Sequence, residues 1–246
     1  MGKTDIYRQT LKALDDWIPF LLKESGLPGP RGNLELAQVV AQEGSKGRFE
    51  HFLSFQAKEN TPEVFLVFCG IVGQGKLTAN EPKLFDRLRS YASDPRWRIR
   101  EAVATGLQLV GDQDMDLLLK EMQKWSKGNW YEKRAAAAAL AEPRLLRKPK
   151  HVKQVLQVLD KITASMENAN HPTDEAFKIL RQGMGYCWSV AVAAQSEAGK
   201  PIMEKWLNSQ NKEIRWIMKE NLKKNRLIKM DANWVKACNA RLEQAD

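Results

Sequence analysis

The chain has 246 residues, 43% of them hydrophobic, and a formal net charge of +9. This hydrophobic content is ordinary for a protein that buries a core, so it argues against disorder along the whole length. The three cysteines, Cys69, Cys187 and Cys238, are an odd number at wide spacing. They fit neither a disulfide framework nor a cysteine metal site, and they favour a reducing compartment.

Targeting and membrane signals are missing from the sequence pattern. The first residues lead straight into an amphipathic segment, without the apolar stretch and cleavage site of a secretory signal. The longest apolar runs, at residues 64–68 and 135–141, are much shorter than the roughly 18 to 20 residues that cross a bilayer. We therefore expect a cytoplasmic, monomeric protein that does not enter a membrane.

Helices are predicted through the first third of the chain. Apolar residues recur at three- and four-residue intervals, and no alternating strand pattern persists. Helices are expected at residues 6–23 and 34–42, separated by a loop at 26–32 that is rich in glycine and proline and forms a hinge or a surface turn. Phe49, Phe52 and Phe55 are expected in the core. The glycine-rich stretch 70–76 lacks the spacing of a phosphate-binding loop and is predicted as a helix end and turn.

Further helices follow between regularly spaced breakers. Ser93 or Asp94 supplies a cap and Pro95 a first-turn proline for a helix over 96–110. Breaks are predicted at 111–112, 128–129, 142–143, 170–172, 199–201 and 209–211. The alanine run 135–139 indicates close packing between neighbouring helices.

A repeat emerges when helices are aligned on an arginine near their start. Arg100, Arg134, Arg181 and Arg215 are separated by 34, 47 and 34 residues, and each follows a turn signal. Units of this size are typical of two-helix solenoid repeats, in which stacked hairpins bury one continuous core. We predict an all-α solenoid of HEAT- or armadillo-like antiparallel helix pairs forming one domain over 1–246. It comprises N-terminal helices at 1–76, a core at 77–230 and a C-terminal helix at 231–246.

The positive charge is unevenly distributed. Residues 1–90 carry a net charge of +1 and the remainder +8. Basic clusters occur at 144–153 and at 212–229, the second with seven Lys/Arg against two Glu. A clustered positive field attracts polyanions and makes nucleic acid the leading partner, although such clusters also occur on solvated surfaces that bind nothing.

Tryptophans stand beside these cations. Trp97, Trp130 and Trp216 each lie within four residues of several Lys or Arg. Aromatic faces stack on bases while guanidinium groups bind phosphates, a combination suited to nucleic acid. The alternative interpretation is that each tryptophan packs in the core and each cation pairs with a nearby carboxylate.

Three segments resemble the DNA alkylation repeat proteins, HEAT-like glycosylases that excise alkylated purines. The stretch 122–136 is similar to the family's tryptophan, turn, tryptophan and arginine segment, which implies that Arg134 binds a DNA phosphate. Residues 96–101 resemble the family's segment of aromatics followed by a catalytic aspartate, which places Trp97 in the pocket and Glu101 at the catalytic position. Residues 181–186 resemble a segment that ends in a pocket tryptophan, here Tyr186.

The resemblance covers residues 77–227 and implies a specific chemistry. Loss of a cationic alkylpurine needs little acid catalysis, so a carboxylate such as Glu101 would stabilise the sugar's developing positive charge. Glu101 stands where the family has aspartate, and Tyr186 where it has tryptophan. Glu101 is equally suited to an ion pair with Arg98 or Arg134.

We therefore predict a DNA-binding solenoid with duplex or alkylated DNA as its partner. Residual glycosylase activity is left open. Its concave basic surface is built from Arg98, Arg100, Lys133, Arg134, Arg181 and Arg215. The alternative is a non-enzymatic scaffold that holds a protein or peptide on the concave face. No cofactor or metal is expected, because His51, His151 and His171 lie in no ligand pattern.

Overall fold

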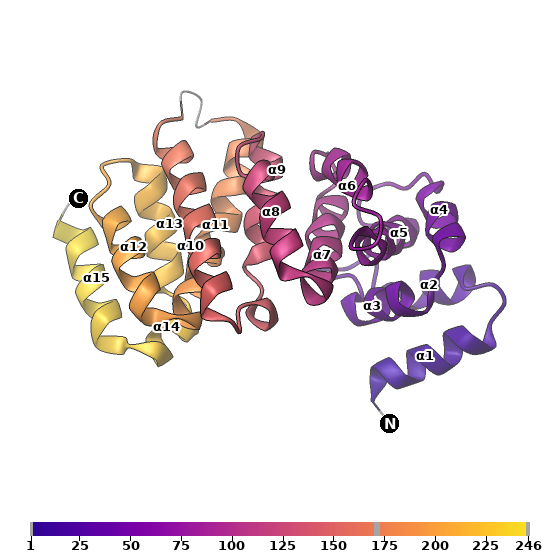
Figure 1. Ribbon diagram of the computed structural model, residues 1–246. Helices are drawn as coiled ribbons and strands as arrows, with labels where there is room; N and C mark the ends of the chain where they lie inside the picture. Colours follow the sequence, from indigo (N-terminus) through magenta and orange to yellow (C-terminus); the bar gives the residue numbers. More distant parts are fainter. Residues whose placement is uncertain (1, 170–172, 245–246) are drawn as a thin grey trace. The chain divides into compact units, whose positions relative to one another are not determined.

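The computed structural model describes residues 2–169 and 173–244 (Figure 1). Within these ranges the chain forms fifteen α-helices, one short 3-10 helix and no strand, and each helix packs against its neighbours. The predicted all-α, solenoid-like fold is confirmed. No described helix combines the length and the apolar character that crossing a bilayer requires. The predicted break at 170–172 lies outside the described residues.

The helices fall into two compact units, residues 1–114 and residues 115–246. The single continuous domain over 1–246 stays a prediction. The first unit contains α1 (Lys3–Ala13), α2 (Ile18–Glu24), α3 (Leu34–Glu43), α4 (Lys46–Leu53), α5 (Pro62–Thr78), α6 (Leu84–Ala92) and α7 (Trp97–Gln113). The helices predicted at 34–42 and 96–110 correspond to α3 and α7.

Helix α5 is the centre of the first unit. It packs against α2, α3, α4, α6 and α7, and most of its residues are buried. The prediction of a helix end at 70–76 is wrong, because α5 continues to Thr78. Its glycines serve close packing instead. A Cβ added to Gly75 would lie 2.3 Å from the Cα of Gly106 in α7, so the two helix backbones touch there.

The segment predicted as one helix at 6–23 is two helices, because polar groups end α1 before Trp17. The Trp17 indole donates to the carbonyls of Leu11 (2.8 Å) and Leu14 (3.2 Å) at the end of α1. Pro19 then stands in the first turn of α2, where its missing N–H costs nothing. The spacing of apolar residues carries no information about such bonds between a side chain and backbone carbonyls. The sequence pattern therefore did not reveal the break.

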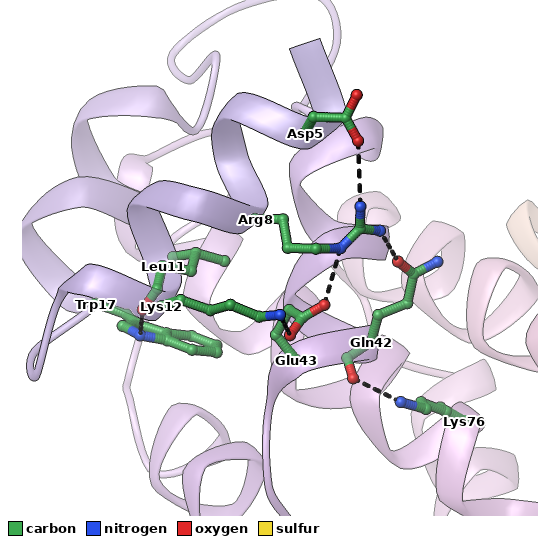
Figure 2. A network of polar contacts seen from close by, with 8 residues as sticks. All are labelled: Asp5, Arg8, Leu11, Lys12, Trp17, Gln42, Glu43 and Lys76. Atoms are coloured by element: carbon green, nitrogen blue, oxygen red, sulfur yellow. Dashed lines mark hydrogen bonds and ion pairs between the residues drawn. The ribbon is translucent and has the colours of Figure 1, made fainter. Parts of the chain in front are cut away.

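Helix α1 is attached to α3 by a polar network (Figure 2). The Arg8 guanidinium donates to Glu43 at 2.9 Å and to Gln42 at 2.8 Å, and it also reaches Asp5 of its own helix at 3.3 Å. Lys12 lies 3.5 Å from the second oxygen of Glu43. The network joins residues more than 30 positions apart in the sequence.

The loop at 26–32 is tied down and serves as a packed surface turn. The Gly29 carbonyl accepts a hydrogen bond from Arg98 of α7 at 2.7 Å, and the Gly29 amide donates to Asn60 at 3.2 Å. Gly26 adopts a φ of 74°, in the left-handed region that glycine enters without strain. Of the two alternatives for this loop, the structure therefore shows the turn.

The second unit is built from two layers of helices. Helices α9, α11 and α13 pack side by side in one layer, and α8, α10, α12 and α15 in the other (Figure 1). The bounds are α8 (Met115–Trp125), α9 (Trp130–Leu140), η1 (Pro143–Leu145), α10 (Pro149–Glu167), α11 (Glu175–Ala194), α12 (Ser196–Leu207), α13 (Lys212–Leu222), α14 (Asn225–Met230) and α15 (Ala232–Gln244).

For this unit, one prediction from the sequence is confirmed and another is wrong. The alanines of α9 are mostly buried, with α11 packed against the helix, as predicted from their small size. The break predicted at 199–201 is wrong, because Pro201 lies inside α12. Gly199 is required there for packing: an added Cβ would lie 2.7 Å from the Cα of Val192.

Candidate nucleic-acid interface

The whole net charge of the chain belongs to the second unit. Residues 1–114 contain 15 Lys/Arg and 15 Asp/Glu, whereas residues 115–246 contain 24 and 15. The boundary between the units therefore separates a neutral part from a part of charge +9. A negatively charged partner would therefore be attracted to the second unit.

The three aligned arginines of this unit lie on successive helices of one layer. Arg134 is in α9, Arg181 in α11 and Arg215 in α13, each within the first two turns, and all three are half-buried. The stem of Arg134 packs against α11, where a Cβ added to Gly183 would lie 3.5 Å from Arg134 Cγ. The alignment of the sequence on these arginines thus picks out a position near the start of each of three neighbouring helices.

Arg181 and Arg215 each connect two helices. The Arg181 guanidinium lies 3.7 Å from the ring centroid of Trp216, and its Nε is 2.5 Å from the Glu213 carboxylate. Arg215 donates to the Leu242 carbonyl at 2.5 Å, near the C-terminal end of α15, where a cation complements the helix dipole. Arg181 therefore joins α11 to α13 within the layer, whereas Arg215 joins α13 to α15 of the other layer.

Lys133 and Trp130 form a similar pair at the start of α9. The Lys133 ammonium lies 4.1 Å from the Trp130 ring centroid, and Trp130 packs edge-on against Phe177 at 5.4 Å. Lys133 is only 9% exposed. Its burial lowers the pKa of the ammonium group. The lysine predicted to bind DNA thus lies mostly beneath the surface.

The most exposed cations of this layer follow one side of α13. Lys212, Lys219 and Lys223 are exposed and recur at helical spacing together with half-buried Arg215 and Trp216; we call these five residues the α13 basic face. Lys223 is paired with Glu220. In the part of the chain that the structure describes, no carboxylate lies within 4 Å of Lys212 or Lys219.

Tyr186 is exposed and belongs to the same unit. It is 42% exposed, on α11, and its ring lies 4.6 Å from the Arg226 guanidinium, which also donates a hydrogen bond to the phenolic oxygen. Arg226 stands beside Lys223, Lys224 and Lys229 around a shallow depression. The contact between Tyr186 and Arg226 spans 40 residues, so no local sequence signal could have revealed it.

Arg98 and Arg100, predicted on the DNA-binding surface, are interior residues of the first unit. Arg98 is 1% exposed and Arg100 is 7% exposed. Arg100 donates to the carbonyls of Asp94 (2.6 Å) and Pro95 (2.7 Å), which closes the turn before α7. Arg98 donates to the Gly29 carbonyl. Both guanidinium groups bind the protein's own backbone, so we leave them out of the candidate interface.

The predicted catalytic carboxylate, Glu101, lies on α7 beside Arg98. The Arg98 guanidinium approaches it at 3.4 Å and also lies 3.7 Å from the ring centroid of Trp97. Of the two ion-pair partners considered for Glu101, the structure shows Arg98. Trp97 is 40% exposed. Because Trp97 and Glu101 belong to the first unit and Tyr186 to the second, the pocket expected from these three residues stays a prediction.

The cysteines and the possible metal ligands of the described residues form no alternative centre. Cys69, Cys187 and Cys238 are free and buried. Among the described residues, no group of three or more His, Cys, Asp or Glu side chains is arranged to hold a metal ion.

A pocket of about 180 Å³ opens beside the α13 basic face, and the sequence did not predict it. It is lined by residues of α13 and of α15, namely Lys212, Arg215, Trp216, Lys219, Asn239, Leu242 and Glu243. The sequence signal for its α13 wall was the basic cluster at 212–229. Its α15 wall had no signal, because only the packing of α15 on α13 brings Asn239 and Leu242 there.

No protein-family model, curated protein or solved structure matches the chain. The resemblance to the DNA alkylation repeat proteins therefore stays a prediction, carried by the short segments that contain Trp97, Arg134 and Tyr186.

Proposed function

We propose that the protein binds nucleic acid, DNA in the first instance, through the α9, α11 and α13 layer of its second unit. The observation that carries the proposal is the partition of charge: this unit holds the entire excess of +9. Neutralisation of phosphates by Lys and Arg supplies most of the sequence-independent affinity for nucleic acid, and it requires an excess of positive charge such as this unit has.

The α13 basic face supports the proposal because its exposed cations are available. Lys212 and Lys219 lie two turns apart on one side of the helix, about 10 Å along its axis. Neither has a carboxylate within 4 Å among the described residues, so binding a phosphate breaks no internal ion pair. Trp216 between them offers an aromatic surface of the kind that bases stack on.

A salt titration of the full chain with a fluorescent DNA duplex tests the proposal. Affinity should fall steeply between about 50 and 200 mM salt, since each phosphate contact contributes a slope of about −0.9 to the plot of log K against log salt. A complex that holds a protein or peptide through apolar anchors would lack this slope. Absence of DNA binding at the lowest salt would end the proposal and favour the scaffold alternative.

A matched pair of double variants locates the interface. Replacing Lys212 and Lys219 by Gln should reduce the salt slope by about two, one for each phosphate that the variant no longer neutralises. The control is the same neutralisation at Lys120 of α8 and Lys161 of α10, two exposed lysines of the other layer. The control should leave the slope unchanged. Equal effects of both pairs would mean that the protein attracts DNA by its total charge and has no defined face.

Excision of alkylated purines is a finer proposal that the binding function does not require. Glu101 already has a structural partner in Arg98, which accounts for its position. The decisive measurement is release of the base from an alkylated duplex by the full chain and by Glu101→Gln. A rate that depends on Glu101 would support glycosylase activity, and an equal rate in both proteins would remove Glu101 from any catalytic role.

A further inference from the structure

The pocket between α13 and α15 has a composition that suggests a particular ligand. Its walls are more apolar than polar, with Leu242 and the Trp216 ring among them, while Lys212, Arg215 and Lys219 place three cations around it. Among the described residues that line it, Glu243 is the one carboxylate. An apolar hollow with a basic rim suits a flat apolar group that is attached to anions.

The size of the pocket limits the ligand further. Its volume is about 180 Å³. Pockets for drug-sized molecules begin at about 300 Å³, so this one accepts a single ring system and leaves any attached sugar or phosphate at the rim. The rim is where the lysine ammonium groups are available.

The Trp216 ring is held in place before any ligand arrives. The Arg181 guanidinium covers it at 3.7 Å, and a Cβ added to Gly185 of α11 would lie 3.1 Å from the ring. On the other side of the pocket, the bond from Arg215 to the Leu242 carbonyl fixes α15 to α13. A wall of fixed side chains loses little conformational entropy when a ligand binds, which favours recognition.

We propose that this pocket receives one unpaired base of a nucleic-acid strand, whose neighbouring phosphates bind Lys212 and Lys219. The inference rests on the proposed function and makes it more specific: the preferred ligand contains an unpaired base, as at a bulge or in a single strand. Lys212 precedes Trp216 by one turn and Lys219 follows it by nearly one turn, so a cation is available on each side of the base. An aromatic side chain of a partner protein would lack the flanking anions that this arrangement complements.

The test compares three DNA ligands with the full chain by fluorescence anisotropy: a plain duplex, the same duplex with one unpaired adenine, and the same duplex with an abasic site in place of that adenine. The unpaired adenine should tighten binding by about 5- to 150-fold, which corresponds to the free energy of stacking one base on an aromatic side chain. The abasic duplex should bind as the plain duplex does, because the backbone distortion is kept and the base is gone.

A pocket-filling variant attributes the preference to this pocket. Trp216→Leu would also remove the stack with Arg181, so Asn239→Trp is the better change: within the described part of the chain, the Asn239 amide donates only to the Val235 carbonyl of its own helix. The control is Ala237→Trp, which adds the same side chain at an exposed position of α15 outside the pocket. Asn239→Trp should abolish the preference for the unpaired base, and Ala237→Trp should keep it.

The outcomes separate the two proposals. Salt-dependent duplex binding without a preference for the unpaired base would overturn the pocket proposal and leave the proposed function standing. A preference that survives Asn239→Trp would also overturn it, since the base would then bind elsewhere. Failure to bind any of the three ligands at low salt would overturn both proposals.

Discussion

Replacement of Arg98 by Met should destabilise the first unit and leave nucleic-acid binding unchanged. Arg98 is 1% exposed, and its guanidinium donates to the Gly29 carbonyl at 2.7 Å and lies 3.4 Å from Glu101. Met keeps the apolar stem and removes the donors. The loop at 26–32 would then lose the bond that ties it to α7, and the part-buried Gly29 carbonyl would lose its partner.

The magnitude follows from these contacts. A hydrogen bond from a charged group contributes about 1.5 to 3 kcal/mol, and the stacking on Trp97, 3.7 Å away, adds about 0.5 to 1 kcal/mol. One effect opposes them: the Arg98 Nε is buried and donates to no group in the described part of the chain, and Met removes that unsatisfied donor. We expect a net loss of about 2 to 3 kcal/mol in the free energy of unfolding.

Two measurements on the same variant separate a structural Arg98 from a DNA-binding one. Urea unfolding followed by circular dichroism gives the stability, and anisotropy with a duplex gives the salt slope under conditions where the variant is folded. The variant should lose stability and keep the slope. A stability within about 0.5 kcal/mol of the parent, or a slope reduced by about one, would refute this account of Arg98.

Three further predictions concern the packing and the titration of single residues. Gly75→Ala should cost several kcal/mol, about the scale of a severe packing defect, because the new Cβ would lie 2.3 Å from the backbone of Gly106. Gly47→Ala in α4, where no atom lies within 4 Å of the new Cβ, should instead be neutral or stabilising, and thermal unfolding compares the two. Arg8→Ala should cost only about 1 kcal/mol, since its bonds to Asp5 and Gln42 are exposed and only that to Glu43 is part-buried, and a loss above about 3 kcal/mol in urea unfolding would contradict that. Burial raises the pKa of the Cys187 thiol to about 12, so its contribution to stability is complete below about pH 9 and is lost as the pH rises towards 12. Between about pH 8 and pH 10 the parent should therefore lose about 1.4 kcal/mol more than Cys187→Ala, and identical pH dependence would exclude the effect.

Two helix ends that were predicted from glycine and proline are wrong, for one physical reason. The stretch 70–76 and the pair at 199–201 have the composition of turns, yet both lie inside helices. In each case a glycine is needed because another helix approaches its backbone: Gly106 faces Gly75, and Val192 faces Gly199. Close approach between helices is a tertiary demand, and it outweighs the local preference of glycine for turns.

The candidate interface divides in the same way. The sequence showed that basic residues gather in the later part of the chain and that Arg134, Arg181 and Arg215 each stand near the start of a helix, since periodicity and charge are properties of residue order. Which cations reach solvent was decided only when the chain folded. Arg98 and Arg100 carry the same charge as Lys212 and Lys219, but backbone carbonyls of the turn before α7 and of the loop at 26–32 bind the first two.

The helical class and the excess of positive charge were determined by the sequence alone, because each depends on spacing and composition along one chain. The tertiary structure decided the division into two units, the placement of all the excess charge in one of them, and the pocket beside Trp216. These features arise where side chains from distant segments meet, as Arg215 meets Leu242 across 27 residues. No local pattern encodes such a meeting, since it depends on how whole helices pack.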